Sequence, residues 1–537
     1  MRILDNLIRQ VNSYSLAGNQ TGSGGSQPQA SSPAPSSSTV QLSPTAMQLG
    51  SQPQYSALQG FDPLYTNNIK LTKDKTIDAL LAGGNYWWHL GTAFADGSNP
   101  SQDASKNLSF SFMNSAVSPQ DAFGFQVLND DQKDVIRAIF AQIATVVGIT
   151  FSEDGSGNGT LKIGSNNQQG ISGGYAYYPN VPTVGGSFYL ANDQANFSNM
   201  STWNPGGYTW TTIIHELGHA LGLKHPGNYN AGGDGKTPGP YLGSKDSKTN
   251  SIMSYKDDKK FMHVVQSNGG GGLFSYQVNP DSFQNYDIAA LQYLYGAPNS
   301  AITTFSFNDN MVFSRSIFNN NADSKIDLSA MTQNNIIDLR GGYRSSIGIR
   351  DPYEATGMTK EQYKAATSGG VKLSKLLGVP TYSGMNNLGI AKGSQIREVI
   401  GGAGSDTIVS GAEIGGEALL KGGAGNDRYF VASGNATIID TSGDNDTLYV
   451  VKKSGTVWTL SEDQTTLTQV NKKTNEVLAT INIAGIENIG TWSGKAKLNG
   501  SKKMLFSGLQ QGSPIQQIKT VEQLDQQKLG VSLDLTA

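Results

Sequence analysis

Residues 215–225 read HELGHALGLKH, and this stretch decides how the surrounding chain must fold. His215 and His219 are four residues apart, so a helix presents both imidazoles on one face, one turn apart. This spacing lets two nitrogens reach one ion at the ~2.0–2.1 Å that zinc prefers. Gly222 can adopt the left-handed conformation that ends a helix, and the reversed chain would then bring His225 to the same ion. Three imidazole ligands leave a fourth zinc position open, as a catalytic site requires.

The same stretch holds a candidate general base. Glu216 follows His215 directly and can reach a water molecule in the open position. Zinc lowers the pKa of such a water towards ~7, and a carboxylate can take its proton and hand it on. A bare HExxH pattern also arises by chance, but three of the five histidines fall within these eleven residues. His89 and His263 lack such a context and are predicted to be structural.

The spacing HExxHxxGxxH resembles that of the metzincin zinc proteases, which carry a methionine turn beneath the metal. Residues 251–255, SIMSY, resemble this turn, with Met253 packed below the ion. The combination resembles the serralysins, secreted bacterial metzincins, over about 77–450. This resemblance implies a zinc endopeptidase in which Glu216 assists attack by zinc-bound water. It also implies that Tyr255 is a further zinc ligand that swings away and donates a hydrogen bond to the tetrahedral oxyanion.

Composition limits the alternatives. A chain of 537 residues is too long for one core, and 65 glycines with 37% hydrophobic residues favour a loop-rich, β-leaning protein. The net charge of −3 gives no basic surface for nucleic acid or an anionic membrane, and no apolar run is long enough to span a membrane. The chain has no cysteine, which excludes disulfides and a cysteine-switch zymogen.

Residues 1–60 are predicted to be a pro-segment followed by a flexible linker rich in Gly, Ser, Gln and Pro, so the protein is expected to be a zymogen. Residues 1–16 do not resemble a Sec signal peptide, because charged and polar residues interrupt the apolar ones. The apolar residues instead trace one helical face. This face is either a short surface helix or part of an inhibitory pro-segment.

Residues 61–297 are predicted to form an α+β metzincin catalytic domain, with a twisted mixed sheet and an active-site helix. Apolar spacing predicts a helix over 131–147, capped by Asn129 or Asp130, and another over 287–295. In metzincins an edge strand pairs with the extended substrate. By resemblance the candidate substrate-binding strand is Gly186, Ser187, Phe188, Tyr189 and Leu190; the alternative is an ordinary internal strand.

Two nonapeptides follow the pattern G-G-x-G-x-D-x-U-x: GGAGSDTIV at 401–409 and GGAGNDRYF at 422–430. Glycine turns direct carbonyls inward and each aspartate adds a charged oxygen, which suits Ca²⁺ and its six or more oxygen ligands. The candidate calcium ligands are Gly402, Gly404, Asp406, Gly423, Gly425, Asp427 and Asp446. The alternative is a pair of Asp-Gly turns. The preferred interpretation is an all-β domain over 298–505, a short parallel β-roll and β-sandwich with few calcium ions.

Two segments depart from the serralysin pattern. Residues 319–324, NNNADS, stand where the family has a calcium loop, and 351–385 resemble an insertion. Calcium-dependent folding suits export of an unfolded chain, so type I secretion is expected, with its signal in 506–537. The expected protein is an extracellular monomer whose partners are protein or peptide substrates, the type I secretion machinery and a proteinaceous inhibitor.

Two other functions remain open. One is a non-catalytic secreted RTX-type adhesin or binding protein with a vestigial zinc site; the presence of Glu216 argues against it. The other is a self-processing effector that cleaves mainly its own N-terminus.

Overall fold

The computed structural model describes residues 69–83, 86–87, 90, 106–170, 172–179, 181, 183–229, 239–258, 263–267, 273–351, 353–354, 359–368, 382–411, 416–431, 433–440, 442–443, 445–451, 453–492 and 532–533. The predictions for 1–60 lie outside these residues, as do those for 506–537 except Ser532–Leu533. The described chain is a mixed α+β protein. Within it, no helix combines the length and the apolar character that a membrane crossing needs.

The described residues group into two compact units, divided between Ala297 and Pro298. A few short segments on one side of this division group with the unit on the other side. The hairpin of β6 (His263–Ser267) and β7 (Leu273–Gln277) groups with the second unit although it precedes Ala297 in the sequence, and Asn310–Phe313 groups with the first. The two units are described separately below.

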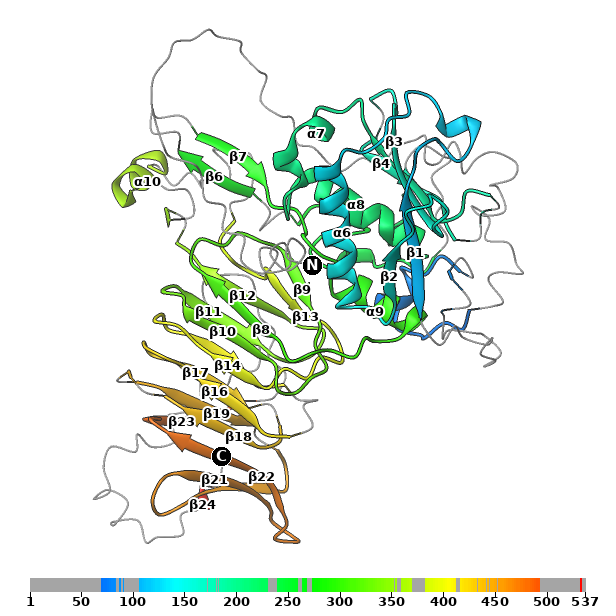
Figure 1. The fold of residues 1–537 in the computed structure, drawn as a ribbon. Helices are drawn as coiled ribbons and strands as arrows, with labels where there is room; N and C mark the ends of the chain where they lie inside the picture. Colours follow the sequence, from blue (N-terminus) through cyan, green and yellow to red (C-terminus); the bar gives the residue numbers. More distant parts are fainter. Residues whose placement is uncertain are drawn as a thin grey trace. The chain divides into compact units, whose positions relative to one another are not determined.

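The first unit contains a five-stranded sheet in the order β2-β1-β3-β5-β4 (Figure 1). Four strands are parallel, and β4 alone runs antiparallel to its neighbour. Parallel neighbours need a long crossover, and the helix α6 supplies the one between β1 and β2. The strands are β1 (Asn107–Phe112), β2 (Thr150–Glu153), β3 (Leu161–Asn166), β4 (Gly174–Ala176) and β5 (Ser187–Ala191).

The strand order corrects one prediction. Ser187, Phe188, Tyr189 and Leu190, with Gly186 just before them, do not form an edge strand, because β5 pairs with β3 on one side and with β4 on the other. All residues of β5 are buried, as expected for an interior strand. The edge on this side of the sheet is β4. The sequence pattern marks both segments as strands but carries no information on which one pairs twice.

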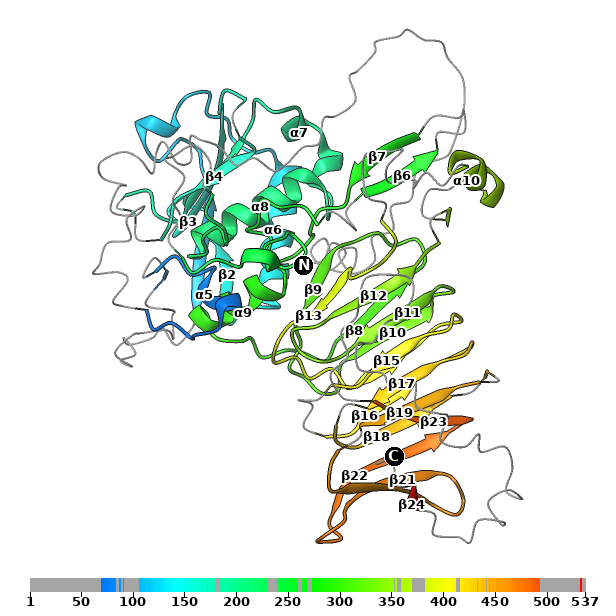
Figure 2. The ribbon, with the colours of Figure 1, turned by 180° about the vertical axis from the view of Figure 1, so that it is seen from behind.

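Helices pack against this sheet (Figure 2). The helix α6 (Asp130–Ala144) begins with a reciprocal capping box between Asn129 and Gln132. The helix α8 (Tyr208–Ala220) contacts β4 and β5 and is buried from Thr209 to its end. The remaining helical elements are α5 (Lys75–Asp78), η2 (Pro119–Asp121), α7 (Ala195–Ser198), η3 (Met200–Trp203), η4 (Gly243–Lys245) and α9 (Asn285–Tyr295).

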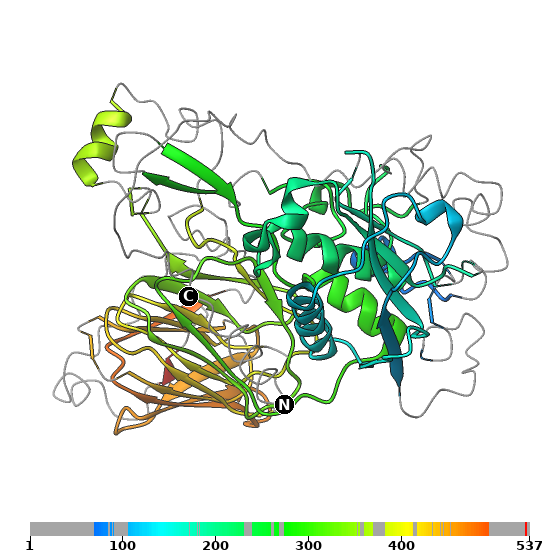
Figure 3. The same cartoon turned by 45° about the horizontal axis from the view of Figure 1, so that its top comes forward.

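The second unit is built mainly from two facing sheets (Figure 3). One has the order β24-β20-β21-β22-β18-β16-β14-β10-β8, and the other the order β23-β19-β17-β15-β11-β12-β13-β9. From β14 to β19 successive strands alternate between the sheets and pair in parallel, so each turn of chain adds one strand to each sheet. The elements up to β16 are β8 (Thr304–Asn308), β9 (Arg315–Ile317), β10 (Lys325–Ala330), β11 (Asn334–Asp338), β12 (Arg344–Ile349), α10 (Lys360–Ala366), β13 (Leu388–Ile390), β14 (Glu398–Ile400), β15 (Thr407–Val409) and β16 (Ala418–Lys421). Those that follow are β17 (Arg428–Val431), β18 (Ala436–Ile439), β19 (Thr447–Val451), β20 (Thr456–Leu460), β21 (Thr466–Asn471), β22 (Val477–Ala484), β23 (Asn488–Trp492) and β24 (Ser532–Leu533).

Glycine allows the turns between these strands to stack closely. Gly423 has a φ of +103°, a conformation that L side chains rarely adopt. A Cβ atom at this position would also collide with the carbonyl oxygen of Gly402 in the preceding turn. Gly434 likewise has a positive φ, of +75°, but no atom lies within 4 Å of its would-be Cβ.

Alanine substitutions at these two glycines are expected to destabilise the protein to different extents. Gly434→Ala should lose about 1–2 kcal/mol of unfolding free energy from backbone strain alone. Gly423→Ala adds a backbone collision and should lose roughly 1–3 kcal/mol more. Denaturant unfolding of both variants measures the difference, and equal losses would show that the turns do not stack as closely as described.

Candidate metal centre

The helix α8 ends in a turn that the sequence specifies. Gly222 has a φ of +97°. Its N–H donates to the His219 carbonyl at 2.9 Å, and the Leu223 N–H reaches back to Gly218 at 2.8 Å. This pair of bonds is the Schellman arrangement, which needs a residue in the left-handed conformation just after the helix. The chain therefore reverses at Gly222, and His225 follows three residues later.

The carbonyls of this reversal are bonded to side chains and backbone from several other segments. Trp87 Nε1 donates to the Ala220 carbonyl at 3.0 Å, and the Tyr295 hydroxyl donates to that of Leu221 at 2.7 Å. The Gly222 carbonyl accepts from the Ala82 N–H at 3.1 Å. Buried backbone groups need such partners, so the path that leads to His225 depends on tertiary contacts as well as on the helix.

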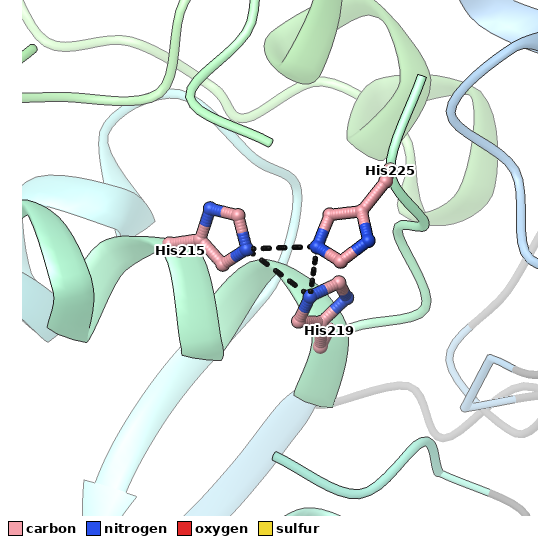
Figure 4. A group of neighbouring side chains, drawn as sticks. All are labelled: His215, His219 and His225. Atoms are coloured by element: carbon pink, nitrogen blue, oxygen red, sulfur yellow. Dashed lines mark hydrogen bonds between the residues drawn. The ribbon is translucent and has the colours of Figure 1, made fainter. Parts of the chain in front are cut away.

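The three histidines meet at one point (Figure 4). His215 and His219 project from α8, and His225 comes from the segment that follows it. Their Nε2 atoms are separated by 3.1 Å (215–219), 3.1 Å (219–225) and 3.2 Å (215–225). Three nitrogens bound to one tetrahedral zinc at ~2.0–2.1 Å would lie about 3.3 Å apart, so the triad fits this ion.

Hydrogen bonds at Nδ1 orient two of the three imidazole rings. His215 Nδ1 donates to the Ile252 carbonyl at 2.9 Å, and His219 Nδ1 donates to the Leu223 carbonyl at 2.8 Å. These bonds place the proton on Nδ1 and leave the Nε2 lone pair facing the centre. Burial lowers the pKa of His219 to about 4, and burial with the neighbouring His219 and His225 lowers the pKa of His215 well below its usual value. His215 and His219 are therefore neutral, as metal ligands must be.

Glu216 lies on the same helix with its carboxyl group buried, at 1% exposure. Its Oε1 has no hydrogen-bond partner among the described residues. Burial raises the pKa of this carboxyl well above its usual value. A buried oxygen without a partner beside a metal triad is the expected feature of a group that bonds to water or substrate.

The turn containing Met253 packs against the helix that carries His215 and His219. Met253 is fully buried, and its Sδ occupies the space that a Cβ at Gly218 would need, between the two helix histidines. Asp287 of α9 holds this turn by accepting hydrogen bonds from Ser251 Oγ at 2.6 Å and from Ile252 N at 2.7 Å. Burial raises the pKa of Asp287 to about 7. The same Ile252 residue supplies the carbonyl that orients His215.

Tyr255 also reaches the triad. Its ring centroid lies 4.4 Å from that of His225 and 6.0 Å from that of His215. The hydroxyl is buried and has no hydrogen-bond partner among the described residues. Burial, with a smaller contribution from Glu216, raises the pKa of the Tyr255 phenol well above its usual value. Glu216 and Tyr255, the two residues proposed from the sequence for catalysis, thus each carry a buried oxygen without a hydrogen-bond partner among the described residues.

In the second unit, the repeat aspartates stack as a ladder. Asp427 Oδ1 accepts from the Asp406 N–H at 2.7 Å, and Asp446 Oδ1 accepts from the Asp427 N–H at 2.7 Å. Asp427, Asp440 and Asp446 are all buried, and each offers an oxygen within 4.8 Å of the others. Oδ2 of Asp427 is buried without a partner among the described residues. These three carboxylates fit a hard cation such as Ca²⁺.

The glycines expected at this site form the stacked turns. Carbonyl oxygens of Gly402 and Gly404 crowd the would-be Cβ atoms of Gly423 and Gly425, respectively. Asp440 was missed by the sequence analysis because it lies outside both nonapeptides and, unlike Asp446, does not continue the spacing from Asp406 to Asp427. The signal available was its spacing, six residues before Asp446 and directly after a β-strand.

Residues 319–321 differ from a cation site in their chemistry. The amide groups of Asn319, Asn320 and Asn321 donate to the carbonyls of residues 301, 298 and 300 at 3.0, 2.8 and 3.3 Å, respectively. Here amide donors face the carbonyl oxygens that a cation would otherwise bind.

No protein-family model matches the chain. Metallopeptidase AprA of Pseudomonas marginalis is 29% identical over 379 residues, covering 66% of this chain and 70% of that protein. Metalloprotease AprA of Pseudomonas entomophila (strain L48) is 28% identical over 366 residues, covering 64% of each. Serralysin of Proteus mirabilis is 32% identical over 254 residues, covering 41% of this chain and 48% of that protein. The last two matches therefore span less than two thirds of the relatives' own lengths.

Among solved structures, the crystal structure of myroilysin aligns with a TM-score of 0.22 and 16% identity, covering 42% of this chain and 98% of that one. A similarity at this level supports no assignment. These three relatives are named as a metallopeptidase, a metalloprotease and a serralysin. The chain is therefore similar in sequence to serralysins and AprA metalloproteases over 41–66% of its length.

Proposed function

We propose that the chain is a zinc-dependent endopeptidase that hydrolyses peptide bonds within extended protein substrates. One observation carries the proposal: the buried Glu216 carboxyl, with an unpartnered oxygen, follows His215 in a triad whose Nε2 atoms lie 3.1–3.2 Å apart. A structural metal site has no use for such a carboxyl group.

His215, His219 and His225 would hold the zinc ion. The ion supplies Lewis-acid chemistry, polarising a peptide carbonyl and lowering the pKa of water at the open position. Glu216 takes a proton from the attacking water and later gives it to the departing amine. Its raised pKa suits both roles, because a weaker acid is a stronger base. Tyr255, whose hydroxyl has no hydrogen-bond partner in the described part of the chain, donates a hydrogen bond to the developing oxyanion.

The free edge of β4 is the proposed substrate-binding strand. Among the described residues, β4 pairs only with β5, which leaves the other side of Gly174–Ala176 available. This edge runs next to the catalytic acid: a Cβ built on Gly174 would lie 3.2 Å from Glu216 Cγ. An extended peptide could add to the sheet here, using backbone bonds that recognise any side-chain sequence. Broad specificity follows from that mode of binding.

We also propose that the second unit is a calcium-stabilised parallel β-roll of the RTX type. Support comes from the alternating parallel strands β14 to β19 and from the aspartate ladder. Metal binding outside the cell would complete folding after export, in line with type I secretion and an extracellular protease. The adhesin alternative also accommodates such a unit, but it leaves the Glu216 arrangement without a role.

The triad predicts one tightly bound zinc ion. His225→Ala should lower zinc affinity by more than the ~10–100-fold loss caused by mutating residues that hydrogen-bond to metal ligands. His263→Ala, which removes a histidine from β6 instead, should leave the affinity unchanged. Competition with a chromogenic chelator measures both, and equal affinities in the two variants would exclude the triad as the zinc site.

The Glu216 assignment predicts a separation of binding from turnover. Glu216→Ala should keep zinc affinity within a few-fold and lose at least ~100-fold in casein cleavage, the lower end of general acid–base contributions. Glu398→Ala, which removes a carboxylate paired with Lys421 in the second unit, serves as the control. Zymograms with and without chelator report activity, and wild-type-like cleavage by Glu216→Ala would contradict the proposal.

Carboxylate crowding predicts how the second unit depends on calcium and pH. Burial raises the pKa of Asp427 to about 8 and those of Asp406 and Asp446 to about 6. Folding favours the protonated forms, so calcium-free stability should fall as pH rises from 3.8 through about 8. Calcium should remove this loss by binding the ionised groups.

Asp440→Asn keeps an acceptor for the Tyr429 hydroxyl, which donates to Asp440 at 2.6 Å, but removes one charge. Calcium affinity should fall roughly tenfold or more, because affinity follows the number of charged ligands. Asp463→Asn, at an exposed hairpin turn, should not change it. Thermal unfolding against calcium concentration measures the effect, and identical curves for both variants would place the cation elsewhere.

A further inference from the structure

Tyr229 lies four residues after His225, and its ring lies close to the rings of His225 and Tyr255. Its ring is stacked on that of Tyr255, with centroids 5.0 Å apart and an interplanar angle of 26°. It also lies 5.9 Å from the His225 ring. No residue pattern in the sequence distinguishes this tyrosine from the chain's other 21.

The hydroxyl of Tyr229 connects two parts of the turn that carries Tyr255. It accepts a hydrogen bond from the Tyr255 N–H at 3.3 Å and donates one to Asp246 Oδ1 at 2.8 Å. The same Asp246 oxygen accepts from Ser254 Oγ at 2.6 Å. Lys256 Nζ lies 2.8 Å from the other oxygen of this carboxylate. The residues before and after Tyr255 are thus tied to one buried acid.

These contacts restrain Tyr255 unequally. Its main chain is held through the Tyr229 hydroxyl, and its ring plane is set by stacking on Tyr229. The Tyr255 hydroxyl itself has no partner among the described residues and is buried beside the triad. A group arranged in this way can exchange partners at its hydroxyl while its backbone and ring plane stay fixed.

We infer that Tyr229 is a positioning residue for Tyr255, and that its hydroxyl sets how the Tyr255 phenol is presented to the metal and to substrate. The inference rests on the proposed function, because it assigns Tyr255 a place at the metal. It goes beyond that function by naming the residue and the single hydroxyl through which the phenol is held.

Tyr229→Phe tests this with the smallest change, since it keeps the stacked ring and removes only the hydroxyl. The full-length protein is loaded with copper(II), which imidazole and oxygen ligands bind more tightly than zinc. A phenolate bound to copper(II) gives a charge-transfer absorption, and Tyr255→Phe shows whether the band belongs to Tyr255. Tyr229→Phe is expected to weaken or shift that band and to lower kcat roughly 10- to 100-fold, as sub-ångström misplacement does, with little change in KM.

Zinc affinity and the unfolding temperature of the zinc-free protein provide the second readout. Tyr229→Phe should keep zinc affinity within about threefold, because none of the bonds that orient His215 and His219 involves Tyr229. Tyr293→Phe, which removes a phenol hydroxyl that donates to the Lys70 carbonyl, is the matched control and should change neither band nor turnover.

Three results would overturn the inference. In the first, Tyr255→Phe abolishes the wild-type band, but Tyr229→Phe changes neither the band nor kcat. This result rejects the positioning role of Tyr229 and leaves the proposed function standing. Parallel losses of zinc affinity, unfolding temperature and kcat in Tyr229→Phe show a general structural role. In the third, the wild-type protein cleaves casein but shows no such band, and the Tyr255→Phe variant remains active. Tyr255 would then not belong to the site, and Tyr229 could not position it.

Discussion

The metal centre depends on the reversal of the chain after α8. A helix alone can align His215 with His219, but the third nitrogen arrives only because Gly222 adopts a positive φ and the carbonyls of residues 220–222 find partners. Those partners come from widely separated parts of the first unit, including Trp87 and Tyr295. Since unpaired backbone groups are costly when buried, the reversal cannot form before these segments pack. The triad is therefore a product of the folded unit, and its short nitrogen–nitrogen distances are preorganised by the protein.

Hydrogen bonds and ion pairs separate the acids that support this centre from the one that would act in it. Asp287 and Asp246 are both buried, and each accepts bonds from the turn around Met253. The Asp246 oxygen without a hydrogen bond lies 2.8 Å from Lys256 Nζ. Glu216 is equally buried, yet one of its oxygens lacks a partner among the described residues, and the same holds for the Tyr255 hydroxyl. An unpartnered buried oxygen costs on the order of 1–3 kcal/mol, so its occurrence at two adjacent positions favours chemistry over support.

The sequence predicted features that depend on residues close together in the chain. It failed where the arrangement of distant segments in three dimensions decides the outcome. The helix spacing of HELGHALGLKH, the Asn129 cap and the glycine–aspartate repeats each depend on residues close in sequence, where periodicity and conformational preference are decisive. The choice of Gly186 to Leu190 as the edge strand was wrong because strand order is decided by partners far along the chain. Asp440 escaped notice for a similar reason: it lies outside the repeats and meets Asp427 and Asp446 only in the folded structure. Tyr229 could not be found at all without seeing which ring it stacks against.

The two candidate metal sites respond to metal in different ways. His215 and His219 are neutral, with the pKa of His219 at about 4, so burying them in the first unit does not require an ion to balance their charge. The aspartate cluster has the opposite electrostatics: Asp427 is fully buried near Asp440 and Asp446, and its pKa of about 8 reflects the cost of ionising it there. At neutral pH this cluster must bind either protons or a cation. Under the proposed function, metal serves chemistry in one unit and electrostatic balance in the other, so that removing each ion should affect a different property of the same protein.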